Sequence, residues 1–257
     1  MQILILVGLY AAVLGLIVGS YLNVVIYRLP LGISTVLPRS RCPGCGAAIR
    51  ARDNVPVLSF LLLRGRCRSC GAEISWRYPL VETATALLFV GCLFRFGLTL
   101  EALVGVVFCC LMLVLALIDF DHMILPDRIT LPGIVLGIAV QPWIRGVGLV
   151  PAIVGALLGA GILLAVWGAW YLVRKEEGMG LGDVKMLALI GAFLGWKGVL
   201  VSLFFAALAG SIVGLALMRW GSHDMRSKLP FGTFLALGGL LALFAGEAIA
   251  DFYARLL

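Results

Sequence analysis

Long apolar segments alternate with short polar stretches along most of the chain. A helix needs roughly 20 apolar residues to cross the hydrocarbon core of a bilayer. The sixth segment is shorter than this, and the pattern leaves its boundary with the seventh open around "GWKG". We therefore predict an all-α polytopic membrane protein with about eight transmembrane helices. The segments are 3–26, 79–97, 100–118, 129–144, 149–173, 184–197, 199–218 and 231–255.

The composition supports a membrane protein and argues against a soluble one. Hydrophobic residues make up 62% of the chain, charged residues only 13%, and the mean hydropathy is +1.11. Soluble domains carry about twice that share of charge. The first apolar segment has no basic region before it and no small-residue cleavage site after it, so we expect it to be retained rather than removed as a signal peptide.

Basic residues give the expected orientation. Sixteen of the twenty Lys and Arg residues follow odd-numbered segments, and four lie on the other side. Basic loops stay in the cytoplasm, so we expect the odd-numbered loops to be cytoplasmic and both termini to lie outside. Nine of these residues fall between Arg28 and Arg77. Beside so many apolar segments, this patch favours contact with anionic lipid rather than nucleic acid.

Residues 28–78 interrupt the apolar pattern and contain four of the seven cysteines. Cys42 and Cys45, followed by Cys67 and Cys70, give the spacing C-x2-C-x21-C-x2-C. Two such pairs can place four thiolates around one Zn²⁺ ion, and a closed shell of four cysteines is structural. A redox pair or unused thiols are the alternatives. We predict a small cytoplasmic zinc domain inserted after the first helix.

A glycine follows each cysteine pair, Gly46 after the first and Gly71 after the second. Because glycine adopts backbone conformations that other residues avoid, we expect these positions to let the chain turn around the metal. The other three cysteines lie in apolar segments, where free cysteine behaves as a small hydrophobic residue. We expect them to be core residues.

Four aspartates lie at predicted helix ends on the cytoplasmic side. Asp119, Asp121 and Asp127 follow the third apolar segment, and Asp183 opens the sixth. Two carboxylates that share one site can act as a base on water and an acid on a leaving amine. An ion-coupled carrier with intramembrane aspartates is the alternative, and Asp183 could instead cap its helix. His122, Asp121 and Asp127 could be ordinary loop residues.

The stretch "GMGLGDVK" (178–185) places three alternating glycines before Asp183. Glycine permits positive φ and the close approach of other groups. We expect Gly178, Gly180 and Gly182 to form the lip of a groove that admits an extended substrate.

With these motifs the sequence resembles the type IV prepilin peptidases. These are bifunctional leader peptidases and N-methyltransferases of the GxGD class of membrane aspartic proteases. GxGD alone is a weak motif, but its combination and order with two CxxC pairs is specific. The matching stretches are "GSYLNVVIYRLP" (19–30), "RCPGCG" (41–46), "CRSCGAEISWRYPLVE" (67–82), "LIDFDHMILPD" (117–127), "GMGLGDVK" (178–185) and "LPFGTFLALGG" (229–239).

The resemblance implies a reaction and its residues. Asp119 and Asp183 correspond to the catalytic aspartates. The implied substrates are type IV prepilins or pseudopilins, cut after Gly at the cytoplasmic face of the bacterial inner membrane. The new N-terminus is then methylated from S-adenosylmethionine. The implied domains are a first helix (1–27), a methyltransferase-associated four-cysteine zinc domain (28–78) and a seven-helix peptidase domain (79–257).

The methyl-donor site is not fixed by these motifs. No glycine-rich loop on a βαβ unit is predicted, so the site must be built differently, from loop 28–78 and the candidate residues Asn23, Arg77, Glu82 and Lys185. Glu82 could instead form an ion pair with Arg77. The alternatives to an enzyme are an ion-coupled membrane carrier and a zinc-bound scaffold of a secretion assembly.

The cysteine spacing predicts one zinc ion per chain. Metal analysis of protein purified without chelators should find a 1:1 ratio, because four thiolates satisfy the tetrahedral preference of zinc. Finding no zinc in such a preparation would rule out the structural site.

Overall fold

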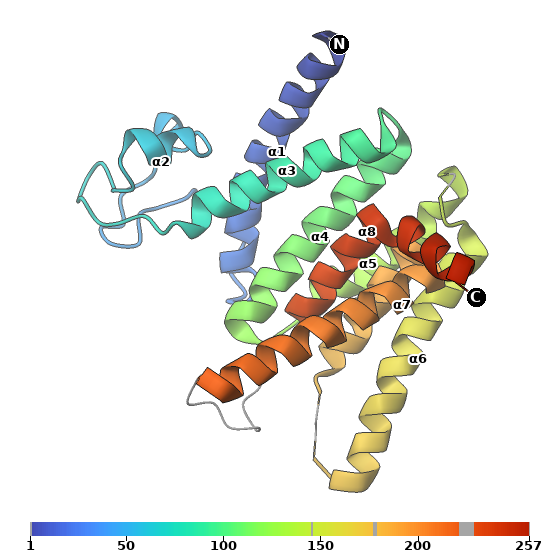
Figure 1. Cartoon of the computed structure of the whole chain (residues 1–257). Coiled ribbons are helices and arrows are strands. Elements are labelled where there is room, and N and C mark those ends of the chain that lie inside the picture. Colours follow the sequence, from blue (N-terminus) through green and yellow to red (C-terminus); the bar gives the residue numbers. More distant parts are fainter. Residues whose placement is uncertain (1, 145, 177–178, 221–228, 257) are drawn as a thin grey trace. The chain divides into compact units, whose positions relative to one another are not determined.

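The computed structural model (Figure 1) describes residues 2–144, 146–176, 179–220 and 229–256. The described part is helical and contains no strand, only two isolated antiparallel bridges. It divides into two compact units, Met1–Ala102 and Leu103–Leu257. The helices are α1 (Gln2–Arg28), α2 (Leu58–Leu62), α3 (Arg77–Phe96), α4 (Leu100–His122), α5 (Asp127–Ala139), α6 (Leu149–Arg174), α7 (Leu181–Trp220) and α8 (Phe231–Leu256), with short 3-10 turns η1 (Ala51–Asp53) and η2 (Gln141–Trp143).

Five described helices are long and apolar enough to cross a membrane, namely α1, α3, α4, α6 and α7. This confirms the predicted polytopic all-α class. The apolar part of α8 identified in this way, Phe231–Gly246, is shorter. The fourth predicted segment forms the 13-residue α5 followed by η2. At about 1.5 Å per residue, α5 is too short to span a hydrocarbon core of about 30 Å. The prediction that the chain crosses the membrane eight times stays a prediction.

The sixth and seventh predicted segments are both parts of α7, which is interrupted at Gly195. This residue has φ 68° and ψ −175°, which is not helical. Positive φ is a conformation that glycine adopts without a steric penalty. The interruption therefore falls at the first residue of "GWKG", the stretch around which the apolar pattern left the boundary of the two segments open.

In the first unit α1 packs against α3. Gly15 and Gly19 allow this close packing. A Cβ atom at Gly15 would lie 2.6 Å from the Ala86 Cα atom, and one at Gly19 would lie 2.7 Å from the Glu82 Cα atom. The buried Asn23 side chain donates a hydrogen bond to the Tyr78 carbonyl at 3.2 Å. These contacts fix the positions at which the inserted segment leaves α1 and enters α3.

In the second unit, α7 packs against α5, α6 and α8 (Figure 1). Its crossing with α6 joins two glycine pairs of the same spacing, Gly155 with Gly159 and Gly191 with Gly195. A Cβ atom at Gly155 would lie 2.6 Å from the Gly191 carbonyl oxygen, and one at Gly191 would lie 2.2 Å from that of Gly155. Small residues at such positions let helix backbones approach in membranes.

Replacement of Gly155 by Ala should therefore destabilise the second unit. The added methyl group collides with backbone atoms of α7, and overpacking of this kind typically costs about 1–3 kcal/mol. Thermal unfolding in detergent should give a lower Tm for Gly155→Ala than for wild type. Gly161→Ala is the matched control on the same helix, because a Cβ atom there meets nothing within 4 Å. Equal Tm values for the two variants would contradict the close crossing.

Candidate functional site

Asp119 lies in the last turn of α4 and is only 5% exposed. Its Oδ2 atom accepts a hydrogen bond from the backbone N–H of Thr233 at 2.8 Å. The Thr233 hydroxyl lies 3.4 Å from the same oxygen and donates to the Ala116 carbonyl at 3.0 Å. The start of α8 thus holds the carboxylate and the turn of α4 that carries it.

Gly232 makes this contact sterically feasible. A Cβ atom at this position would lie 2.9 Å from Asp119 Oδ2 and 3.0 Å from the Leu125 Cδ1 atom. The Gly232 N–H also donates to the Asp119 carboxylate. Two consecutive backbone N–H groups therefore point at one carboxylate, an arrangement that stabilises negative charge.

Asp183 lies in the first turn of α7 and is 8% exposed. Because the helix begins at Leu181, Asp183 is inside it, and the alternative that this residue caps the helix is wrong. Its backbone N–H donates to the Gly180 carbonyl at 3.2 Å. Within the described residues, the Asp183 carboxyl group has no hydrogen-bond donor of the kind that Asp119 receives.

Gly180 and Gly182 do not use the positive φ that glycine permits, since neither is among the positive-φ glycines of the structure. Helix α7 already starts at Leu181, so Gly182 is helical. Gly178 lies outside the described residues. The expectation of close approach holds for Gly182, where a Cβ atom would lie 2.9 Å from the Leu125 Cβ atom. The approaching group is a side chain rather than a backbone.

Leu125 connects the two aspartates, since its side chain packs against both Gly182 and Gly232. Asp119 and Asp183 are close enough for their charges to repel each other. Three segments that are distant in the sequence, at the ends of α4, α7 and α8, thus meet around two buried carboxyl groups. Such a pair can share one proton and act as base and acid.

The neighbouring polar residues of the motifs lie at the edge of this site. Asp127, in the first turn of α5, forms an ion pair with Lys185 of α7. This pair ties the two helix starts together, and Lys185 is thereby engaged with a carboxylate. Asp121 and His122 are exposed at the end of α4.

Thr233 is the residue that the sequence reasoning missed. It belongs to the quoted stretch "LPFGTFLALGG", to which no chemical role was given. Its position after a proline and a glycine, at the start of an apolar helix, was the available signal. The stretch alone could not indicate which carboxylate the backbone N–H would meet.

In the first unit, the four predicted cysteines come together as expected. The Sγ atoms of Cys42, Cys45, Cys67 and Cys70 all lie within 4.8 Å of one another. Cys42 Sγ and Cys70 Sγ are 3.8 Å apart, which matches the spacing of about 3.8 Å for tetrahedral sulfur ligands at about 2.3 Å from zinc. The donor set therefore fits a structural zinc ion.

The two cysteine pairs have the same local structure. Gly46 donates to the Cys42 carbonyl at 2.8 Å and Gly71 donates to the Cys67 carbonyl at 2.9 Å. Both glycines have positive φ, 70° and 72°. This bears out the expectation that a glycine after each pair lets the chain turn around the metal.

Electrostatics differ between the two thiols of the second pair. The Ala72 N–H lowers the pKa of Cys70, but the Cys45 thiol, burial and the other two thiols together raise it to about 12. The pKa of Cys67 is lowered to about 6, first by the backbone N–H of Cys70, then by that of Ser69 and by the Cys42 thiol. The thiolate is the form that binds zinc. Of the three cysteines expected in the core, Cys92 and Cys109 are buried in the helices, whereas Cys110 is only partly buried.

The remaining candidate residues for the methyl-donor site lie where α1 and α3 meet the inserted segment. Glu82 is buried and its Oε2 atom accepts a hydrogen bond from the Val57 N–H at 2.7 Å. Asn23 joins α1 to α3, as described above. Arg77 is the first residue of α3. The pairing of Glu82 with Arg77 stays a prediction.

Two family models match the chain. The bacterial peptidase A24 N-terminal domain matches residues 13–96, and the type IV leader peptidase family matches residues 106–215. No solved structure was found to be similar to this one.

Several proteins named prepilin leader peptidase/N-methyltransferase are similar over almost their whole length. The protein of Pseudomonas putida is 43% identical, over 93% of this chain and 91% of its own. That of Burkholderia pseudomallei is 40% identical, over 92% and 85%. That of Pseudomonas aeruginosa is 38% identical, over 93% and 91%. Both family models match this chain, and these relatives align with most of it. The chain therefore belongs to the type IV leader peptidase family.

Proposed function

We propose that this multi-pass membrane protein is a prepilin peptidase and N-methyltransferase in which Asp119 and Asp183 form the catalytic pair. The observation that carries the proposal is the meeting of these two buried carboxyl groups around Leu125. The substrates are the type IV prepilins or pseudopilins that the family resemblance implies. An ion-coupled carrier or a scaffold finds no support among relatives that are named as peptidases.

The surroundings of the two carboxyl groups suggest different roles. Asp119 receives backbone N–H groups from Gly232 and Thr233, which suit a negative charge. Asp183 is equally buried, at 8% exposed, and among the described residues its carboxyl group receives no such donors, which suits a neutral carboxylic acid. We assign the general base to Asp119 and the general acid to Asp183.

The chemistry then follows from these positions. Asp119 removes a proton from a water molecule whose oxygen forms a bond to the scissile carbonyl carbon. Asp183 gives its proton to the amide nitrogen as the C–N bond breaks. The products are a leader with a new carboxyl group and a mature protein with a free amine. A proton passed from Asp119 to Asp183 restores the starting state.

The location of the reaction rests on the charge pattern. The loops that carry most of the basic residues include those at Asp127 and Asp183, so we place the dyad at the cytoplasmic face and both termini outside. The domain division at residues 28–78 and 79–257 follows the same proposal, with the four-cysteine segment serving methylation. S-adenosylmethionine would supply the methyl group, and zinc would hold the four-cysteine segment folded.

Loss of either aspartate should abolish cleavage. With purified enzyme and a prepilin in detergent, Asp119→Ala and Asp183→Ala should each lower the cleavage rate by about 10²–10⁴-fold, the usual effect of removing an acid or base. Asp121→Ala is the control, since this exposed aspartate is two residues from Asp119 and should retain activity. Cleavage that survives both changes, or wild-type protein that never cleaves, would refute the dyad.

The hydroxyl of Thr233 should matter because it holds the start of α8 against the turn of α4. Thr233→Val keeps the shape and the backbone N–H but removes the hydrogen bond to Ala116. We expect kcat for leader cleavage to fall by about tenfold, the equivalent of one lost hydrogen bond, with KM little changed. Thr233→Ser keeps the hydroxyl and should restore most of the rate. If the Val and Ser variants behave alike, the hydroxyl has no positioning role.

A further inference from the structure

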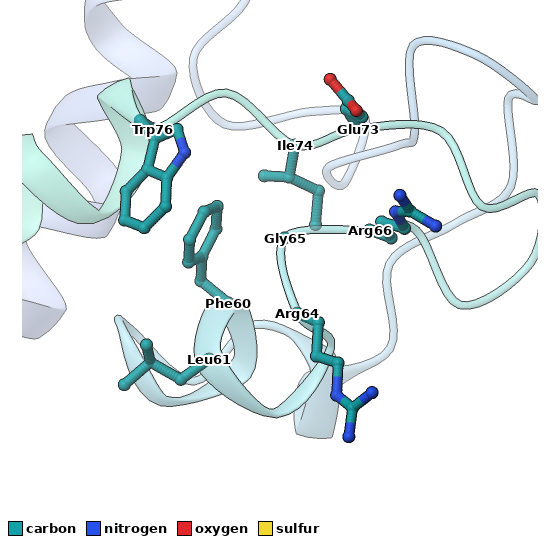
Figure 2. Close-up of a pocket in the computed structure, with 8 residues that line it drawn as sticks. All are labelled: Phe60, Leu61, Arg64, Gly65, Arg66, Glu73, Ile74 and Trp76. Carbon is teal, nitrogen blue, oxygen red and sulfur yellow. The ribbon is translucent and has the colours of Figure 1, made fainter.

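The first unit contains a cavity of about 380 Å³ that the peptidase chemistry does not use. It lies between α2 and the chain that leads into α3 (Figure 2). Small-molecule sites commonly have volumes of about 300–1,000 Å³. Neither the cysteine ligands nor the four earlier donor-site candidates line it. Its lining includes Phe60, Leu61, Arg64, Glu73, Ile74 and Trp76.

Two aromatic rings form the apolar part of the cavity. Phe60 and Trp76 lie with ring centroids 4.7 Å apart in an edge-to-face arrangement, and Figure 2 shows them next to each other. Phe60 is 8% exposed, whereas Trp76 is 68% exposed. The buried ring thus supports an indole whose surface remains open. An exposed indole in this position offers a stacking surface for a planar heterocycle.

Charged groups of both signs line the cavity, namely Arg64, Arg66 and Glu73. Figure 2 shows the Glu73 carboxylate and the Arg64 guanidinium to one side of the two rings, each pointing away from them. Within the described residues, neither side chain has a hydrogen bond or an ion pair. Glu73 can accept hydrogen bonds from hydroxyl groups, and Arg64 can bind a carboxylate through paired donors.

The helix that lines the cavity is held in a strained setting. Val57 and Arg64, just before and just after α2, have φ values of 58° and 52°. Left-handed backbone is rare for residues other than glycine and is a true outlier for a β-branched residue such as valine. Glu82 accepts the Val57 N–H at 2.7 Å and so stabilises this conformation from α3. Strain that persists at both ends of a short helix points to a functional requirement.

We propose that this cavity binds the adenosyl part of the methyl donor, an inference that rests on the methyltransferase half of the proposed function. The adenine ring would stack on Trp76. The Glu73 and Arg64 side chains would turn toward the ligand, Glu73 to accept hydrogen bonds from the ribose hydroxyl groups and Arg64 to pair with the donor's carboxylate. Asn23, Glu82 and Arg77 then lie outside the donor site, with Glu82 acting through the strained start of α2 as a positioning residue.

The test measures donor binding rather than turnover. Full-length, zinc-loaded protein in detergent is titrated with S-adenosylhomocysteine by calorimetry, and with radiolabelled S-adenosylmethionine by equilibrium dialysis. Trp76→Leu should weaken binding by about tenfold or more, the usual effect of losing an aromatic stacking partner. Glu73→Gln should also weaken it, and Trp76→Phe should restore part of the affinity.

Trp143→Leu is the matched control, because Trp143 in η2 is 72% exposed and belongs to the other unit. It should bind the donor as wild type does. Zinc content reports whether each variant keeps the four-cysteine segment folded. If Trp76→Leu loses zinc, donor binding by Glu73→Gln tests the site instead, because Glu73 is exposed and its replacement should leave the segment folded.

Two results would overturn the proposal, and they can be told apart. If wild type and both variants bind the donor equally well, the donor site lies elsewhere while the proposed methyltransferase function stands. If wild type cleaves a prepilin but neither binds the donor nor transfers a labelled methyl group to the product, the methyltransferase function fails together with the site.

Discussion

The burial of the Asp119 carboxylate is the constraint on which the second unit depends. An acidic group at the C-terminal end of a helix faces the negative end of the helix dipole, and at 5% exposure it has little water. The N–H groups of Gly232 and Thr233 at the start of α8 supply the compensation. Because α8 must begin against the last turn of α4, the position of one carboxylate also fixes the packing of two helices.

Close packing at glycines brings the second carboxylate to the same place. Gly182 and Gly232 leave room for Leu125, so the starts of α7 and α8 can both approach the end of α4. The crossing of α6 with α7 at Gly155 and Gly191 uses the same principle further along the helix. In a bilayer, apolar side chains gain little by leaving lipid for protein, so close backbone approach replaces the hydrophobic effect as a driving force.

The first unit solves a different problem. The segment between α1 and α3 is too short to build a large apolar core, and small domains of this kind often use a structural metal instead. Two matching cysteine turns with left-handed glycines bring the thiols to the spacing that zinc requires. The hydrogen bond from Val57 to Glu82 ties the same segment to α3.

The sequence by itself determined the membrane class, the helical segments, the cysteine cluster and the candidate aspartates, because hydropathy and ligand spacing are local properties of the chain. It did not indicate Thr233 or the helical start at Leu181, and it did not show that the break near "GWKG" falls at Gly195. These features were decided by tertiary structure. Each depends on which group from a distant segment arrives at a residue, as when Thr233 reaches Asp119 across 114 positions, and no local pattern records that contact.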